Sequence, residues 1–133
     1  MVILAGKKRV LFLCTHNSAR SQMAEGLLRH FNGESWVASS AGTEPSRVHP
    51  LAIEVMREIG IDISGHRSKH LSEFEGQEFE LVVTLCGGAH AACPFFAGAK
   101  EMRHRGFEDP SGGGIEGFRR CREAVKKWIL DDF

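Results

Sequence analysis

Short apolar runs alternate with amphipathic segments along this chain of 133 residues. Continuous apolar runs are typical of parallel strands that are buried on both faces. Strand-like patterns, strong in the first and third cases, occupy segments 10–13, 36–39, 79–85 and 100–104. Apolar residues recur at helical spacing in segments 21–32, 50–60 and 115–129. The dipeptide Asn32-Gly33 and Gly60 are typical helix stops, and Pro50 suits the first turn of a helix.

This alternation predicts the fold class. Strand–helix–strand units place successive strands parallel in one sheet and their helices on its faces. We therefore expect a single α/β domain over residues 1–133, with a parallel four-stranded sheet flanked by helices on both faces. The order of the strands does not follow from the sequence. Ligands of such sheets bind at the carboxyl ends of the strands, where the first and third strands lead into Cys14 and Cys86.

Charge and composition exclude several classes of protein. The chain has 17 Lys and Arg against 17 Asp and Glu, so neither nucleic acid nor an anionic membrane surface is an expected partner. No apolar stretch approaches the roughly 20 residues of a membrane helix. At the N-terminus the apolar residues precede the basic ones, the reverse of a secretory signal. We therefore expect a cytoplasmic protein, acting as a monomer.

The four cysteines are the main candidates for chemistry. They are Cys14, Cys86, Cys93 and Cys121. In a chain without an export signal, cysteines favour catalytic or metal-binding roles over structural disulfides. Cys121 lies on the apolar stripe of the last helical segment and is expected to be a small core residue.

The segment that starts at Cys14 has the form Cys-x5-Arg and lies between a buried strand and the start of a helix. Its backbone N–H groups and the positive end of the helix can cradle a tetrahedral oxyanion. Arg20 would add a planar, bidentate guanidinium. The expected oxyanion-binding loop consists of Thr15, His16, Asn17, Ser18, Ala19, Arg20 and Ser21.

The same surroundings predict a reactive thiolate at Cys14. They should lower the pKa of this thiol from about 8.5 into the range of roughly 3.5 to 7.5. The hydroxyl groups of Ser18 and Ser21 are close enough in sequence to bind the sulfur, and Asn17 tolerates left-handed backbone. The alternative is a strand-to-helix turn whose cysteine is simply buried.

Cys86 and Cys93 flank a segment of small residues, 87–92. The two thiols can meet if that segment forms a loop or unwinds, whereas a rigid helix would keep them apart. Zinc binding by Cys86, His90 and Cys93 is disfavoured because the spacing differs from that of structural zinc sites and no fourth ligand is evident. We expect no metal. The alternative is a pair of unrelated buried cysteines.

The segment 107–114 offers a general acid. If the fold brings it over the Cys14 loop, a carboxyl group there can protonate a leaving oxygen. Asp109 precedes Pro110, which restricts its backbone, and it is therefore better presented than Glu108. The alternative is that this segment is only a turn and a helix cap.

Together these motifs resemble the low-molecular-weight protein tyrosine phosphatase superfamily and, within it, the thioredoxin-coupled arsenate reductases. The resemblance extends over segments 14–26, 40–43, 61–66, 82–86, 93–94 and 107–110. Phosphatases of this superfamily usually have Pro after the Arg-Ser of the loop and an aromatic residue after the Asp-Pro. This chain has Gln22 and Ser111 there. Phosphatases also lack the pair Cys86 and Cys93, so the resemblance favours the reductases.

The resemblance implies a mechanism. Cys14 attacks arsenate held by the loop and Arg20, while Asp109 protonates the departing oxygen. Cys86 then attacks Cys14 and releases arsenite, and Cys93 attacks Cys86 in turn. Thioredoxin reduces the resulting disulfide, so no bound cofactor is expected, and the segment between the last two cysteines must be mobile. Phosphate and sulfate are expected to compete with arsenate.

The chain departs from some members of this family at two places. Ala19 stands where some have another cysteine, which is not one of the relay thiols. Some also bind a potassium ion beside the loop, through groups that match Asn17, Glu25 and Ser40. Their further acidic ligand corresponds here to Lys69, whose ammonium group is expected to replace the ion.

Other functions remain as alternatives. A low-molecular-weight protein tyrosine phosphatase acting through a phosphocysteine would need only Cys14, Arg20 and Asp109. A thiol-based redox sensor or partner-binding protein with the same fold would turn over no oxyanion. An electron donor other than thioredoxin could use fewer of the cysteines.

Overall fold

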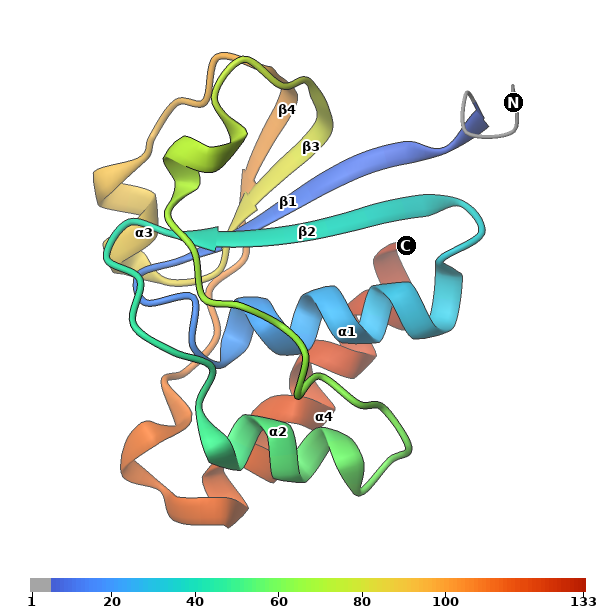
Figure 1. Ribbon diagram of the computed structural model, residues 1–133, viewed down its shortest axis with the longest axis vertical. Helices are drawn as coiled ribbons and strands as arrows, with labels where there is room; N and C mark the ends of the chain where they lie inside the picture. The colour runs from blue at the N-terminus through green and yellow to red at the C-terminus, as the bar shows by residue number, and fades with distance from the viewer. Residues whose placement is uncertain (1–5) are drawn as a thin grey trace.

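The computed structural model describes residues 6–133, so the apolar residues 1–5 used above lie outside the described residues. One parallel sheet has the order β2-β1-β3-β4 and consists of β1 (Lys8–Cys14), β2 (Trp36–Gly42), β3 (Phe79–Thr84) and β4 (Ala99–His104) (Figure 1). The helices are α1 (Arg20–Asn32), α2 (Pro50–Arg57), α3 (Gly87–Ala92) and α4 (Gly114–Asp132). Two short 3-10 helices are η2 (Leu71–Phe74) and η3 (Pro110–Gly112).

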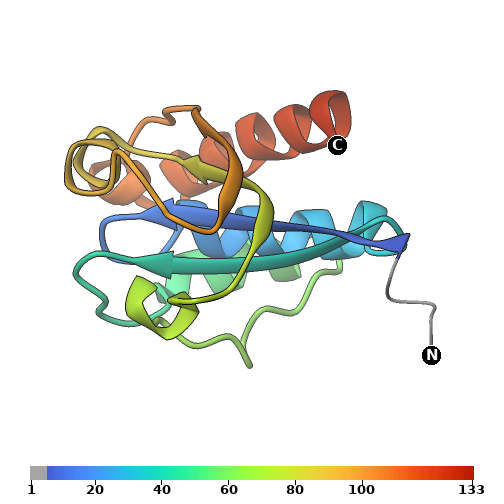
Figure 2. The same cartoon turned by 90° about the horizontal axis from the view of Figure 1, so that it is seen from above.

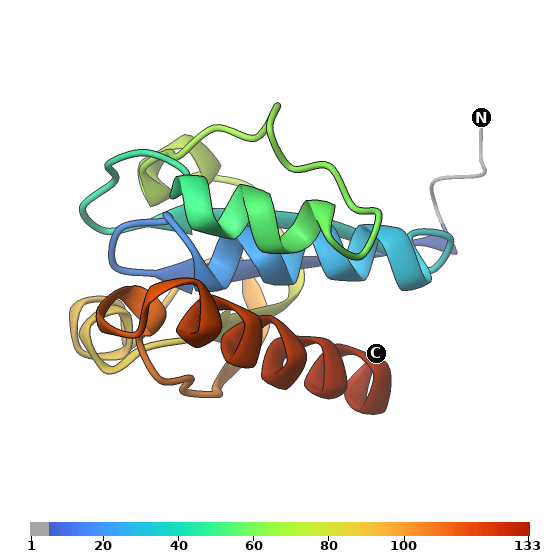
Figure 3. The ribbon, with the colours of Figure 1, turned by 90° about the horizontal axis from the view of Figure 1, so that it is seen from below.

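Helices cover both faces of the sheet, as the sequence predicts. The helices α1, α2 and α4 pack on one face (Figure 3), and α3 and η2 pack on the other. Side chains of β1 alternate between the two cores: Val10 and Phe12 face the three long helices, whereas Leu11 and Leu13 face α3 and η2. None of these four has any exposed surface, which explains the continuous apolar run in the sequence.

Some element boundaries differ from the sequence pattern. Helix α2 ends at Arg57, because the chain turns away and reaches Gly60 with φ of 79°. Strand β2 continues to Gly42, paired along its whole length with β1. The segment 87–92 is a short helix, although only Ala89 of it is buried. Within residues 6–133, no helix is both long and apolar enough to cross a membrane.

The strand order creates a crevice at the carboxyl ends of β1 and β3. The chain leaves β1 toward β2 on one side, and it later adds β3 on the other side of β1. A parallel sheet binds ligands at such a switch in strand order. Figure 2 shows β1 and β2 ending at the same edge of the sheet. Cys14 ends β1 and Cys86 follows β3, so both lie at this edge.

Candidate active site

Asn17 organises the loop that connects β1 to α1. Its φ of 49° is left-handed, as the sequence allows for this residue. Its side-chain NH₂ donates to the hydroxyls of Ser21 at 2.8 Å and Ser40 at 3.0 Å. Its side-chain oxygen accepts from the Gln22 amide and from the Lys69 N–H, each at 3.0 Å. These buried hydrogen bonds fix the shape of the loop.

The chain after β2 binds the outer side of this loop. Hydrogen bonds of 2.8 to 3.2 Å join the carbonyl groups of Thr15, His16 and Ser18 to the N–H groups of Glu44, Ser46 and His49, respectively. The C=O and N–H of a trans peptide unit point in opposite directions. The N–H groups that share peptide units with these three carbonyls, those of His16, Asn17 and Ala19, therefore point away from the chain after β2. The loop is therefore arranged as an anion cradle.

Arg20 joins the loop to the segment that contains Asp109. Its Nη1 donates to the Phe107 carbonyl at 3.0 Å, and its Nη2 lies 4.0 Å from Asp109 Oδ2. The Ser111 N–H, which binds Asp109 Oδ1 at 3.0 Å, and the nearby Arg20 charge both lower the pKa of Asp109. Asp109 thus faces the loop and also caps η3. The same residue can therefore act as a general acid and as a helix cap.

A cavity of about 190 Å³ joins these groups, and it is the candidate site. It is lined by Cys14, His16, Ser18, Ala19, Arg20, Ser46, His49, Asp109, Ser111 and Phe118. The fold therefore brings Cys14, Arg20 and Asp109 together, although Asp109 is 95 positions from Cys14 in the sequence. The lining also includes His49, which the sequence analysis did not single out.

Hydrogen-bond donors surround the Cys86 sulfur. The nearby Cys14 thiol, in the same buried cluster, has the largest lowering effect on the pKa of Cys86, and the Thr15 hydroxyl lies 3.3 Å from the Cys86 sulfur. The Ala89 N–H, in the first turn of α3, donates to it at 3.4 Å. These donors stabilise the thiolate and lower the pKa of Cys86 to about 4.

The pKa of Cys14 is raised, whereas the sequence predicts a lowered one. The neighbouring Cys86 thiol and burial raise the pKa of Cys14, and the nearby Arg20 charge only partly offsets this. Two neighbouring thiols titrate as a pair, and in this pair Cys86 has the lower pKa. Transfer of the Cys14 proton to the Cys86 thiolate would move the negative charge to Cys14.

The Thr15 hydroxyl provides a test of this arrangement. Thr15→Val should raise the pH midpoint of Cys86 alkylation by about one pH unit, because a hydrogen bond to a charged group is worth about 1.5 kcal/mol or more. Mass-spectrometric mapping of iodoacetamide-labelled Cys86 against pH gives the midpoint. Thr15→Ser keeps the hydroxyl and should leave it unchanged. An equal midpoint in the wild type and the valine variant would contradict the assignment.

Helix α3 separates Cys93 from Cys86. Cys93 is buried, and its thiol donates to the Phe95 carbonyl at 3.5 Å. Seven residues of intact helix span about 10 Å, whereas a disulfide needs Cα atoms within about 7 Å. All four cysteines are free in this structure. A bond between Cys86 and Cys93 therefore requires α3 to unwind.

Comparison with known proteins places the chain in a family. The model for low molecular weight phosphotyrosine protein phosphatase matches residues 9–130. The chain belongs to this family. Arsenate reductase 2 of Staphylococcus epidermidis is 43% identical over 123 residues, covering 92% of this chain and 94% of that protein. The resemblance seen in the sequence is thus confirmed.

Solved structures agree with this assignment. An arsenate reductase in an oxidized state has a TM-score of 0.83 at 38% identity, and the match covers 93% of this chain and 95% of that chain. A thioredoxin-dependent arsenate reductase of Corynebacterium glutamicum has a TM-score of 0.74 at 29% identity, covering 98% of this chain and 64% of that chain.

Lys69 lies beside Glu25 and Asn17, two of the groups that match the potassium ligands of some family members. Its ammonium is 4.0 Å from Glu25 Oε1 and donates to the Arg67 carbonyl at 3.0 Å. Burial lowers the pKa of Lys69. Glu25 also accepts from the Ser40 hydroxyl and from Arg29, each at 2.5 Å. Two cations therefore balance this buried carboxylate.

Two further observations complete the site. Within residues 6–133, no three His, Cys, Asp or Glu residues are grouped so as to hold a metal ion. Cys121, on the inner face of α4, is buried in the core, as predicted, and burial raises its pKa to about 11. It lines a separate cavity of about 390 Å³ beside the segment of Asp109.

Proposed function

We propose that this chain is an arsenate reductase, in which Cys14, Cys86 and Cys93 form a thiol relay that thioredoxin regenerates. The observation that carries this proposal is that Cys14 lines a small cavity beside Arg20 and Asp109 and shares one buried cluster with Cys86. A phosphatase reaction needs one nucleophilic thiol, whereas reduction needs a second thiol that can reach the first. The arsenate reductases among the relatives support the same conclusion.

The first step joins arsenic to Cys14. Arg20 and the loop N–H groups hold hydrogen arsenate, and Cys14 passes its proton to Cys86. The Cys14 thiolate attacks arsenic, so that an S–As bond forms, an As–O bond breaks, and the departing hydroxide takes one proton to leave as water. Asp109 supplies that proton. The negative charge of the bound anion raises the pKa of this carboxyl group above its low resting value and so favours its protonation.

The second step reduces arsenic. Cys86 gives up its proton, which ends on an oxygen of the departing arsenite, and its thiolate, stabilised by the donors around its sulfur, attacks the Cys14 sulfur. An S–S bond forms and the S–As bond breaks. The electron pair of that bond stays on arsenic, which leaves as arsenite. As(V) gains two electrons, and the two thiols are oxidised to a disulfide.

The third step frees the site for another cycle. A Cys93 thiolate attacks the Cys86 sulfur, forms the Cys86–Cys93 disulfide and releases Cys14 as a thiolate. Helix α3 must unwind for this step. Six-residue helices have little stability of their own, and Gly87 and Gly88 in its first turn lower it further. Two thiols of thioredoxin then reduce the disulfide, with two electrons transferred.

We also propose that Lys69 takes the place of the potassium ion bound by some family members. Exchanging sodium for potassium at fixed ionic strength should change kcat less than about twofold, because the ammonium already neutralises the Glu25 carboxylate. Lys69→Asp should create cation dependence, since it adds a second carboxylate beside Glu25. A large rate increase with potassium in the wild type would contradict this role of Lys69.

The proposed function is tested by coupled NADPH consumption. Wild-type protein with arsenate, thioredoxin and thioredoxin reductase should consume NADPH, and Cys14→Ser should not. Glutaredoxin with glutathione in place of thioredoxin tests the other thiol donors. Hydrolysis of an aryl phosphate, measured in parallel, should be slow. Fast hydrolysis that depends on Cys14, without NADPH consumption, would establish a phosphatase instead.

A further inference from the structure

Two histidines line the cavity beside Cys14, and they come from different parts of the fold. His16 belongs to the loop after β1, and His49 is the N-cap of α2. Neither has a role in the relay described above. Each ring has one nitrogen in a hydrogen bond with backbone, and that bond determines the protonation of the other nitrogen.

His49 is held as a neutral hydrogen-bond donor. Its Nδ1 accepts from the Leu51 N–H at 3.0 Å, and a backbone N–H can only donate. Nδ1 therefore carries a lone pair, and the proton of the ring is on Nε2. The ring packs against Phe118 with centroids 4.5 Å apart, and both rings line the cavity. His49 thus offers the cavity an N–H donor without a positive charge.

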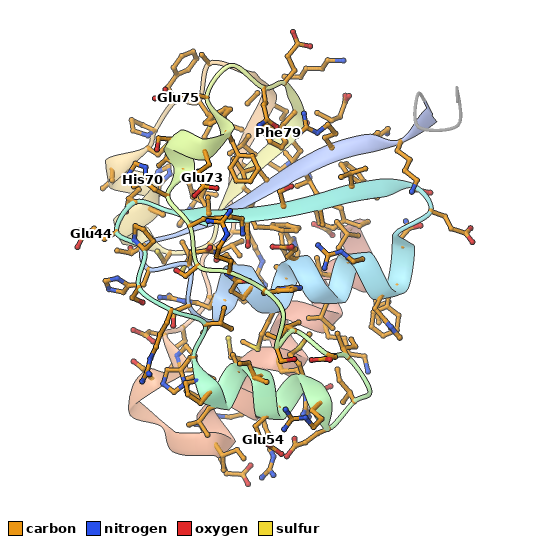
Figure 4. The ribbon with its side chains drawn as sticks, in the orientation of Figure 1. Glu44, Glu54, His70, Glu73, Glu75 and Phe79 are labelled. Carbon is orange, nitrogen blue, oxygen red and sulfur yellow. The ribbon has the colours of Figure 1, made fainter. Side chains whose placement is uncertain are left out.

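His16 has the opposite tautomer. Its Nδ1 lies 2.9 Å from the carbonyl oxygen of Glu44, and a carbonyl oxygen can only accept. Nδ1 therefore carries the proton, and Nε2 of the neutral ring has a free lone pair. Glu44 lies on the loop that follows β2, beside the end of that strand (Figure 4). In its neutral form His16 thus offers the cavity a hydrogen-bond acceptor.

An acceptor that cannot also donate is unusual in a site for an anion, whereas the hydroxyls of Ser18, Ser46 and Ser111 in the same lining can do either. The carboxylate of Asp109 is already engaged by the Ser111 N–H and by Arg20, and its side chain is 63% exposed. Hydrogen arsenate and hydrogen phosphate each carry one O–H group beside their negative oxygens, whereas sulfate carries none at neutral pH. An acceptor stabilises the O–H group and repels a bare oxygen.

We propose that His16 and His49, in opposite tautomers, select tetrahedral oxyanions that carry a proton over sulfate. His49 Nε2–H binds a negative oxygen of any such anion. His16 Nε2 accepts the O–H of hydrogen arsenate or hydrogen phosphate and disfavours sulfate. This proposal rests on one part of the proposed function, namely that the cavity binds the oxyanion. It does not require that the bound anion is reduced.

Asparagine at either position makes a matched pair of variants. The Asn side chain has its polar atoms near the position of the histidine Nδ1, so His49→Asn retains an acceptor for the Leu51 N–H. Likewise, His16→Asn retains a donor for the Glu44 carbonyl. Each variant loses only the ring and its Nε2 atom, and the thermal midpoint of each should stay near that of the wild type.

The test is calorimetric titration of the reduced protein with inorganic phosphate and with sulfate, at mildly alkaline pH. Wild type should bind phosphate about tenfold more tightly than sulfate, and His16→Asn should lower this ratio about fivefold. His49→Asn should weaken both anions about fivefold and leave the ratio unchanged. An unchanged ratio in His16→Asn, unchanged affinities in His49→Asn, or no binding of phosphate by the wild type would each overturn the proposal.

The titration separates this inference from the proposed function. Selective phosphate binding without arsenate-dependent NADPH consumption would refute the reductase and leave the role of the histidines intact. If the protein reduces arsenate but binds phosphate and sulfate equally, the reductase is supported and the role of the histidines is refuted.

Discussion

Replacing Cys93 with serine should abolish steady-state arsenate reduction and leave a single release of arsenite per molecule. The first two steps use only Cys14 and Cys86, which lie in the same buried cluster at the carboxyl ends of β1 and β3. Without Cys93 the disulfide between them persists in a buried site, so kcat should fall by about 100-fold or more. Replacing Cys86 with serine should release no arsenite, because nothing then attacks the Cys14 adduct.

The measurement is rapid-quench assay of arsenite with excess enzyme, together with steady-state NADPH consumption. Mass spectrometry of the quenched Cys93→Ser protein should find the Cys14–Cys86 disulfide. Cys121→Ala is the matched control, since Cys121 is a buried core residue of α4 and has no part in the relay. It should turn over as the wild type does. Repeated turnover by Cys93→Ser would show that the reductant attacks the first disulfide directly and that the relay has two thiols.

Replacing Gly42 with alanine should destabilise the protein by about 3 kcal/mol and lower Tm by about 10 °C. Gly42 ends β2 against the oxyanion loop. A Cβ atom there would lie 2.6 Å from the Thr15 carbonyl oxygen and 2.9 Å from the Asn17 nitrogen. Both are backbone atoms of the loop, so they cannot move aside as a flexible side chain would. The loop must shift, and arsenate turnover should fall with stability.

Urea and thermal unfolding of the reduced protein check this expectation. Gly65→Ala is the matched control, because a Cβ atom at Gly65 would have nothing within 4 Å. It should unfold near the wild-type midpoint. If Gly42→Ala had wild-type stability and wild-type turnover, the close approach of β2 to the loop would not be required for either.

Local features of the site could be predicted from the sequence because they depend on short-range chemistry. A cysteine that ends a buried strand, followed by small and polar residues and an arginine, predicts an anion loop, and Asn17 takes the left-handed conformation that this loop needs. The burial of β1 on both faces also follows from its uninterrupted apolar run. The sequence selected Asp109 by its position before Pro110, but only on the condition that the fold brings its segment over the Cys14 loop, and the local pattern could not establish that condition.

The pKa of Cys14 shows where local reasoning fails. The sequence places amide donors and Arg20 around this thiol and predicts a lowered pKa. In the fold, Thr15 and the N-terminus of α3 direct their donors to Cys86, and the neighbouring Cys14 thiol lowers the pKa of Cys86 as well. The lower pKa therefore belongs to a residue that is distant in sequence, which no motif around Cys14 could reveal.

His49 was missed for a similar reason. In the sequence it is only the residue before Pro50, which suits the first turn of a helix. In the structure His49 is the N-cap of α2. Its second role depends on the packing of α2 and α4, which brings the ring against Phe118 at the wall of the cavity.

The sequence by itself determined the α/β class, the two-sided burial of β1, the family, and the residues able to do thiol chemistry, because these depend on residue type, periodicity and short motifs. Only the tertiary structure decided that β3 lies beside β1, which brings Cys86 into the same buried cluster as Cys14. Strand order depends on how whole helices pack over the sheet, and no local preference specifies it. The same packing separates Cys93 from Cys86 by a short helix and sets His16 and His49 at one cavity in opposite tautomers.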